Sequence, residues 1–414
     1  MYFFEYIVII KLVNTYNYLG DIIIMKTVKY CFTSKKLLGY MILLFVVFET
    51  AFENTQLQIY NLNMNRTLFS IEASIFLVYI FISKYKKYLF IVVMSFFILF
   101  LSSYFVLDTS ALFKMYMIAM VVYEIGYKEV FEKIFKIRAF ILCSIVFLSI
   151  IGVLDSNLME VYKKTSSVAV YGYGLGYTHP NRLATAVLYL IFIYICLKNE
   201  KLKKQNVYCI IFLTFIVYEL TKSRTLLYCI IIFCLYYGLH RINKLKNTVE
   251  KCVSRLAFLC IPISILISVF VPILLLTAKG KVQNMVYFIN DLCSRRFTHI
   301  EHAFLQYPVT LQGGIYDFSE MEKNYGSTVI DNGYIRFLYA YGIIGLTIFS
   351  ILSIVCMVRM TKKRKFTYVV ICIIASFQAL LENTFMYVSL NIMVLFWCEI
   401  IDVNNKNHWR KNDT

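Results

Sequence analysis

The most regular feature of the chain is the repetition of long apolar stretches separated by short polar breaks. A helix that spans a bilayer needs about 20 mainly apolar residues, and fewer when its ends are buried among neighbours. Twelve stretches meet this requirement. We therefore predict an all-α, polytopic membrane protein with about twelve transmembrane helices over residues 37–54, 67–83, 88–107, 110–126, 139–154, 181–197, 206–221, 225–239, 256–276, 334–358, 366–383 and 386–401.

The composition supports a membrane protein and argues against a water-soluble one. Hydrophobic residues make up 60% of the 414 residues and charged residues only 16%, whereas soluble domains carry roughly 25% charge. The mean hydropathy is +0.68. Most of the 12 cysteines lie inside apolar stretches, where they behave as small hydrophobes, and no zinc-type CxxC pair is present.

The net charge of +18 is explained by the polar breaks, in which Lys and Arg cluster. Basic loops remain on the cytoplasmic side of a membrane, so these breaks predict the orientation of the chain. No basic patch with interleaved aromatic residues occurs elsewhere, which argues against a nucleic-acid partner. The basic positions are Lys84, Lys86, Lys87, Lys128, Lys133, Lys136, Arg138, Lys198, Lys201, Lys203, Lys204, Arg241, Lys244, Lys246, Lys251, Arg255, Arg359, Lys362, Lys363, Arg364 and Lys365.

Three regions follow from this orientation. Residues 1–36 form a cytoplasmic or interfacial segment, residues 37–401 the multi-pass domain, and residues 402–414 a cytoplasmic tail, so both termini are expected in the cytoplasm. Residues 155–180 and 277–333 are the long outward segments. Met25 opens a basic leader, and translation beginning there competes with an interfacial helix over residues 1–24.

The first candidate site is the segment YGYGLGYTHPNRLA, which enters the span at 181–197. Pro180 suits the first turn of a helix, and the exposed N–H groups of a helix start favour an anion. His179, Asn181 and Arg182 are therefore candidate substrate-binding residues. A helix cap with a surface His and Arg is the structural alternative.

Cationic residues mark two further candidate positions. Arg224 lies in the short turn ELTKSRTLL, near the outer interface, with Glu219 as a partner or with its guanidinium directed to lipid headgroups. In CSRRFTHIEHAF, helical spacing places Arg295 and His299 on one face, with Arg296 beside them. A metal site of His299, Glu301 and His302 is disfavoured by the two arginines, so we expect an anion and no metal here.

Carboxylates supply the last candidates. Asp331 and Asn332 stand at the outer mouth of the span at 334–358, and Glu382 lies in the turn LLENTF. Asp331 is a candidate general base or orienting group, with a simple helix-capping residue as the alternative. Arginine binds phosphate oxygens in bidentate fashion. A lipid pyrophosphate headgroup is thus the expected anion at this membrane face.

Four short motifs in this order, GYTHPNRLA, TKSRTLL, SRRFTHIEHAF followed by LQGG, and DNGYIRFLYAYGIIGL, resemble those of the Wzy-type polysaccharide polymerases in the O-antigen ligase superfamily. The resemblance implies a GT-C-like glycosyltransferase that polymerises undecaprenyl-pyrophosphate-linked repeat units into capsule, exopolysaccharide or O-antigen on the outer side of the cell membrane. It also implies that Arg224 and Arg296 bind the pyrophosphate.

The same resemblance sets expectations for cofactors, partners and rivals. The lipid donor is already activated and the chain has no Asp-x-Asp pair, so no cofactor and no nucleotide sugar are expected. The partners are the lipid-linked glycan, the bilayer and a chain-length regulator. Ligases usually carry His where this chain has Asp331, which favours a polymerase. A flippase for lipid-linked oligosaccharides, a ligase-type transferase and a non-enzymatic membrane protein remain alternatives.

Overall fold

The computed structural model describes residues 35–58, 62–83, 87–107, 109–165, 168–316, 318–326 and 330–401. It is 79% helical, and within the described residues one two-stranded hairpin forms the sheet. The expectations for residues 1–34 and 402–414, including the start at Met25, lie outside this part of the chain. The prediction of a helical protein is confirmed.

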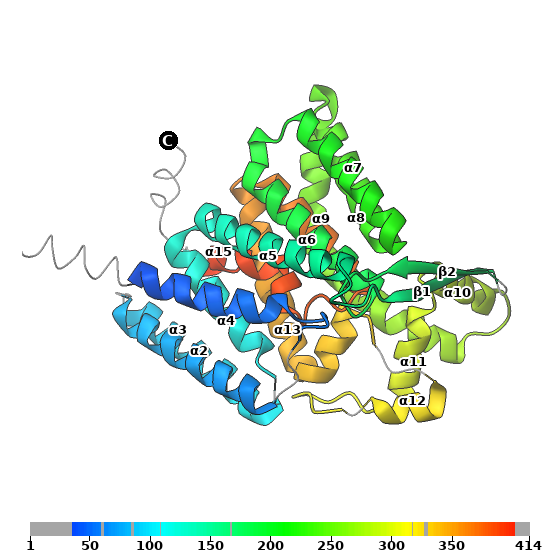
Figure 1. Cartoon of the computed structure of the whole chain (residues 1–414), viewed down its shortest axis with the longest axis horizontal. Helices are drawn as coiled ribbons and strands as arrows, with labels where there is room; N and C mark the ends of the chain where they lie inside the picture. The colour runs from blue at the N-terminus through cyan, green and yellow to red at the C-terminus, as the bar shows by residue number, and fades with distance from the viewer. Residues whose placement is uncertain are drawn as a thin grey trace, which may run out of the picture.

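The N-terminal helices form one side of the molecule (Figure 1). A helix over residues 35–51 contacts α2 and α4, since Gly39 lies against Tyr79 and Ile125. The ring centroid of Phe76 in α2 lies 5.9 Å from that of Phe113 and 5.4 Å from that of Tyr116, both in α4. Their burial gives this side of the molecule its apolar core. These elements are α2 (Leu62–Ile82), α3 (Lys87–Leu107), α4 (Ala111–Ile125) and α5 (Tyr127–Ile150).

The second half of the chain is built on longer helices, which pack side by side in Figure 1. Three of them are long and apolar enough to cross a membrane, namely α6 (Pro180–Lys198), α9 (Asn243–Thr277) and α13 (Gly333–Lys362). Residues Val92–Leu101, α8 (Arg224–His240) and α14 (Phe366–Leu381) are shorter apolar helices. Between α6 and α8 lies α7 (Lys204–Thr221).

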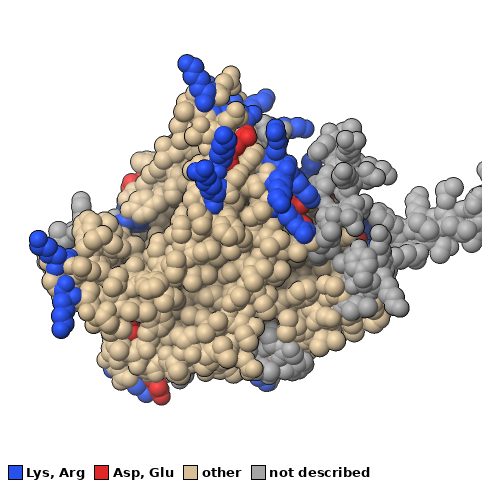
Figure 2. All heavy atoms as spheres, turned by 180° about the vertical axis from the view of Figure 1, so that it is seen from behind, with Lys and Arg blue, Asp and Glu red and all other residues tan. Residues whose placement is uncertain are grey.

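The surface also agrees with a membrane environment. Large apolar side chains stand exposed on α5, α7 and α9, among them Phe140 at 75%, Phe212 at 67% and Phe258 at 59%. In Figure 2, Lys and Arg gather along the upper part and the left edge of the face, and other residues form the broad area between them. An apolar surface of this extent is costly in water and suits lipid. These features are compatible with a membrane protein.

Two of the basic breaks are helical instead of being loops. Lys128, Lys133, Lys136 and Arg138 lie in the first half of α5, and Lys244 to Arg255 form the start of α9. Lys and Arg are good helix formers, so a charged segment between two spans continues the helix of its neighbour. Both helices therefore extend beyond the apolar stretches that predicted them.

The expected transmembrane helix at 386–401 is wrong, because no continuous helix forms there. This segment consists of the short 3₁₀ helices η2 (Val388–Leu390) and η3 (Ile392–Phe396) and of α15 (Cys398–Ile401). Its side chains are almost all buried in the protein. A segment that is enclosed by other helices needs no continuous helix of its own, although its apolar composition matches that of a span.

The two segments that were expected to face outward also contain regular secondary structure. Residues 155–180 contain an antiparallel hairpin of β1 (Leu158–Thr165) and β2 (Val168–Tyr173). The second segment contains α10 (Gly280–Leu292), α11 (Arg296–Gln306) and α12 (Ser319–Tyr325). The hairpin projects to one side of the molecule in Figure 1, and its strands contact α6 and α7.

The LQGG segment docks directly on a kink in α13. Gly314 N donates to Tyr339 O at 3.0 Å, while Ile343 N and Ile344 N donate to Thr310 O and Leu311 O, each at 3.1 Å. The kink is at Gly342, which has φ +66° and ψ −174°. A Cβ there would lie 2.3 Å from Leu311 O, so only glycine allows this approach.

Gly342→Ala is therefore expected to destabilise the protein by about 2–5 kcal/mol, because it adds a positive-φ strain to a backbone clash. The matched control is Gly238→Ala in α8, where a Cβ would meet nothing within 4 Å. That variant should gain up to about 1 kcal/mol from helix propensity. Thermal unfolding of both variants in detergent measures these effects. Equal unfolding temperatures would contradict the close contact between the LQGG segment and the kink at Gly342.

Candidate functional site

The site lies where the ends of four helices meet. Arg182 from α6 places Nη2 3.8 Å from Asp331 Oδ1, and Arg296 from α11 places Nε 3.9 Å from Asp331 Oδ2. Arg296 Nη2 is also 3.0 Å from Glu382 Oε1, at the end of α14. We call Arg182, Arg296, Asp331 and Glu382 the arginine–carboxylate cluster. It joins residues that are up to 200 positions apart in the sequence.

His179 fixes the start of α6 and so the position of Arg182. The His179 backbone is extended, and its Nδ1 accepts a hydrogen bond from Asn181 N at 3.1 Å. Pro180 occupies the first turn, where its missing N–H costs nothing. The capping alternative is thus correct for His179, and its ring remains close enough to Asp331, Arg182 and Arg296 to feel their charges.

Asn332 has a comparable structural part at the start of α13. Its Oδ1 accepts from Tyr334 N and Ile335 N at 3.0 Å each, and its Nδ2 donates to Ser268 Oγ at 2.8 Å and Leu380 O at 3.0 Å. An amide side chain has two donors and two acceptor lone pairs, and all four are used here. Asn332 therefore holds α9, α13 and α14 together beneath Asp331 and has no group left for a substrate.

The turn before α11 separates the two neighbouring arginines. Ser294 and Arg295 have φ of 58° and 60°, a left-handed pair that turns the chain sharply. Arg295 is 77% exposed and pairs with Asp291 at 2.9 Å, outside the cluster, whereas Arg296 is 11% exposed and points inward. Of the two, Arg296 alone joins the cluster.

Asn290 holds this turn in place. Its Oδ1 accepts from Phe297 N at 3.1 Å, and its Nδ2 donates to Thr298 Oγ1 at 2.7 Å. The side chain is buried. Asn290 therefore fixes the first turn of α11 and with it the direction of Arg296.

The first residues of α8 approach the cluster through Thr225. Thr225 Oγ1 donates to Glu382 Oε1 at 3.4 Å, while Arg224 is half-buried beside it as the first residue of the helix. Glu219, the partner expected for Arg224, forms an ion pair with Lys222 at 2.5 Å. The structure thus puts Arg224 next to the cluster and Arg182 within it.

Two donors in the cluster lack a partner. Arg182 Nη1 and Arg296 Nη1 are buried and have no hydrogen bond to the described residues. Buried N–H groups are rarely left unpaired, so such atoms indicate a missing acceptor. An anion that lies between the two guanidinium groups would supply it.

Burial and charge together shape the titration of the cluster. Burial alone would lower the pKa of Arg296, but the Glu382 and Asp331 carboxylates outweigh it and hold that pKa above its usual value. Burial raises the pKa of Glu382, and the Arg296 guanidinium opposes that rise. Arg296 consequently stays charged at any working pH.

Burial also lowers the pKa of His179 and of His299, although Asp331 acts in the opposite direction on both rings. Both imidazoles are therefore neutral near pH 7. A neutral ring beside two arginines can accept or donate a hydrogen bond without adding to their repulsion.

These shifts predict a loss of stability in acid. Because the folded pKa of His299 lies below its unfolded value near 6.5, stability is fully present above that pH and falls as the pH drops below it. The unfolding temperature should fall by less between pH 7.5 and pH 5.5 in His299→Gln than in the wild type. An identical drop in both proteins would show that His299 does not carry this dependence.

The sequence did not single out two residues that contact the site. Thr225 reaches Glu382, and the ring of Tyr387 lies 5.2 Å from the Arg182 guanidinium carbon, as in a cation–π contact. Tyr387 lies shortly after Glu382 in the sequence. Its position just after a helix that ends in polar residues is the sequence feature that could have pointed to it.

No metal site forms among the described residues, since no group of three His, Cys, Asp or Glu side chains is placed to hold an ion. His302 instead stacks on Tyr325 with ring centroids 4.4 Å apart. The chain matches no protein-family model, and no curated protein or solved structure matches it. The chemistry of the site is therefore interpreted from its own residues.

Proposed function

We propose that the protein is a membrane glycosyltransferase that joins lipid-pyrophosphate-linked glycan units into a surface polysaccharide. The observation that carries this proposal is the pair of unpartnered guanidinium nitrogens of Arg182 and Arg296. They lie beside two carboxylates, Asp331 and Glu382, where four helix ends meet. Such a site combines an anion-binding group with a proton acceptor.

The arginines would bind the leaving group. In the reaction, a sugar hydroxyl of one unit attacks the anomeric carbon of another, and the bond from that carbon to the pyrophosphate oxygen breaks. Negative charge grows on the departing pyrophosphate. Fixed donors stabilise that charge more in the transition state than in the ground state, which is what accelerates the reaction.

The two carboxylates would have different roles in the reaction. Asp331 keeps 29% of its side chain exposed and is the group that would take the proton of the attacking hydroxyl. Glu382 is 2% exposed and lies against Arg296, so it orients the guanidinium. The new glycosidic bond, the proton on Asp331 and the released lipid pyrophosphate balance the reaction.

The proposal includes a membrane topology. About twelve spans, a GT-C-like arrangement and cytoplasmic termini would put the cluster on the outer face, where α11 contributes Arg296. The helices that are compatible with a membrane, and the helix ends that form the cluster, support this orientation.

Expression in a strain that lacks its own polymerase but makes the matching lipid-linked unit tests the proposal. Extracted lipid-linked glycans should form a ladder on a gel with the wild-type chain, and a single band without it. A single band in both strains, with the unit already on the outer face, would contradict polymerisation. If the unit reaches the outer face only when the protein is present and never lengthens, a flippase is the better reading.

A further inference from the structure

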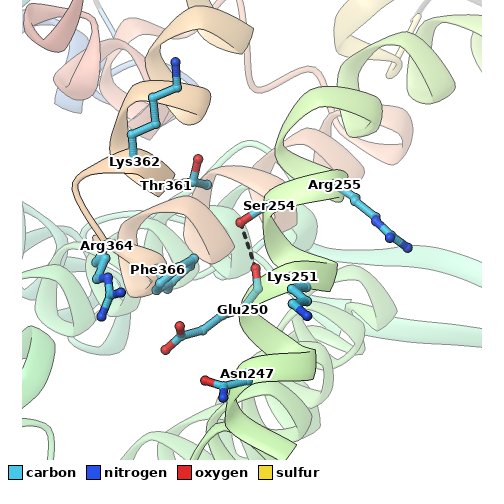
Figure 3. Close-up of a pocket in the computed structure, with 9 residues that line it drawn as sticks. All are labelled: Asn247, Glu250, Lys251, Ser254, Arg255, Thr361, Lys362, Arg364 and Phe366. Carbon is cyan, nitrogen blue, oxygen red and sulfur yellow. Dashed lines mark hydrogen bonds between the residues drawn. The ribbon is translucent and has the colours of Figure 1, made fainter.

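A cavity of about 520 Å³ lies between the start of α9 and the turn that joins α13 to α14. It is far from the arginine–carboxylate cluster, because α9 rises about 20 Å between Ser254 and Ser268, which contacts Asn332. Figure 3 shows its lining, with Asn247, Glu250, Lys251, Ser254 and Arg255 from α9 and Thr361, Lys362, Arg364 and Phe366 from the other side.

The lining is strongly cationic. Lys251 and Arg255 from α9, and Lys362 and Arg364 from the end of α13 and the turn after it, line the cavity. In Figure 3 the Arg255 side chain extends away from that turn. Glu250 is the acidic lining residue, and its Oε1 lies 3.2 Å from His240 Nε2. The cavity therefore carries an excess of positive charge, which favours an anionic group.

The polar lining and its surroundings indicate what kind of anion fits. Asn247 adds an amide to the lining, whereas the Thr361 hydroxyl donates to Val358 O at 2.7 Å. The Ser254 hydroxyl likewise donates to Glu250 O at 2.8 Å, the contact drawn in Figure 3. One turn along α9 from Arg255, Phe258 and Leu259 are 59% and 43% exposed. An ionic pocket beside an exposed apolar helix face matches a molecule with an anionic head and an acyl tail.

We propose that this cavity binds the phosphate headgroup of an anionic phospholipid, whose acyl chains lie along the exposed face of α9. The polar start of α9 ends at Arg255 and its apolar part follows at once, so the cavity would sit at the level of the headgroups. Basic pockets between membrane helices bind anionic lipid headgroups in this way. The site is independent of the proposed glycosyl transfer.

The test is a titration of the detergent-solubilised full chain with fluorescent phosphatidylglycerol. We expect saturable binding that phosphatidylcholine does not displace. The variant Lys251→Gln/Arg364→Gln should bind roughly 20-fold more weakly, since each cation near a headgroup contributes substantially to such binding. The control Lys128→Gln/Lys201→Gln removes the same charge from exposed positions outside the cavity and should bind as the wild type does.

Three results would overturn the proposal. Equal affinity of the cavity variant and the wild type would exclude the cavity as the binding site. Equal weakening in both double variants would indicate attraction by net charge alone. Displacement by inorganic phosphate at the concentrations at which phosphatidylglycerol competes would identify a soluble anion as the ligand. Unfolding temperatures of all variants show whether each is folded.

Discussion

Arg296→Gln is expected to lower polymer formation by at least 10²- to 10³-fold, the usual effect of removing one donor that stabilises charge in a transition state. The same change leaves the Glu382 carboxylate buried without its ion-pair partner at 3.0 Å. Removal of one member of a buried pair costs about 3–5 kcal/mol. The extracted glycan ladder and the unfolding temperature measure the two effects separately.

Two companion variants distinguish catalysis from folding. Arg296→Gln/Glu382→Gln removes both charges of the pair and should recover most of the lost stability while remaining inactive. Arg295→Gln changes the neighbouring arginine, which is 77% exposed and pairs with Asp291, and should keep full activity. If Arg295→Gln is as inactive as Arg296→Gln, the inward position of Arg296 does not explain its importance for activity.

Asp331→Asn is expected to reduce turnover by about 10²- to 10⁴-fold, the contribution of a positioned general base. Asparagine keeps the shape of the side chain but cannot take the proton of the attacking hydroxyl. The fold should be retained, because the distances from Asp331 to Arg182 and Arg296 are long, at 3.8 and 3.9 Å. Initial rates of lipid-linked glycan extension measure this change.

The control for this variant is Asp291→Asn, which neutralises an exposed carboxylate of the same outward segment, paired only at the surface with Arg295. Its rate should equal that of the wild type. Normal turnover by Asp331→Asn would show that Asp331 is not the general base. Asp331 would then be only an electrostatic partner of the two arginines, and another group would take the proton.

The sequence predicted the helical fold well because apolar stretches of span length leave few alternatives. The prediction of helices failed where an apolar segment is buried by other parts of the protein and not by lipid. Residues 386–401 are apolar like a span, yet other helices bury them as short 3₁₀ turns. The hairpin at 158–173 was also missed, since its strands have no partners beyond each other and carry only a weak pattern.

For the candidate site, the sequence pointed to segments that the structure brings together, but it could not predict which residues of each segment meet. Polar residues at the ends of apolar helices pointed to His179, Arg182, Arg296, Asp331 and Glu382. Whether Arg295 or Arg296 faces inward depends on the left-handed pair at 294 and 295, which no local pattern reveals. Likewise, the capping of α13 by Asn332 depends on contacts with Ser268 and Leu380, far away in the sequence.

The most direct test of the proposed function uses purified protein in vesicles together with the matching lipid-linked repeat unit. We expect longer lipid-linked glycans to form without any nucleotide sugar, with one lipid pyrophosphate released for each unit joined, and neither product with Arg296→Gln/Glu382→Gln. If the wild-type protein leaves the unit at its original length and releases no lipid pyrophosphate, glycosyl transfer at the arginine–carboxylate cluster is contradicted.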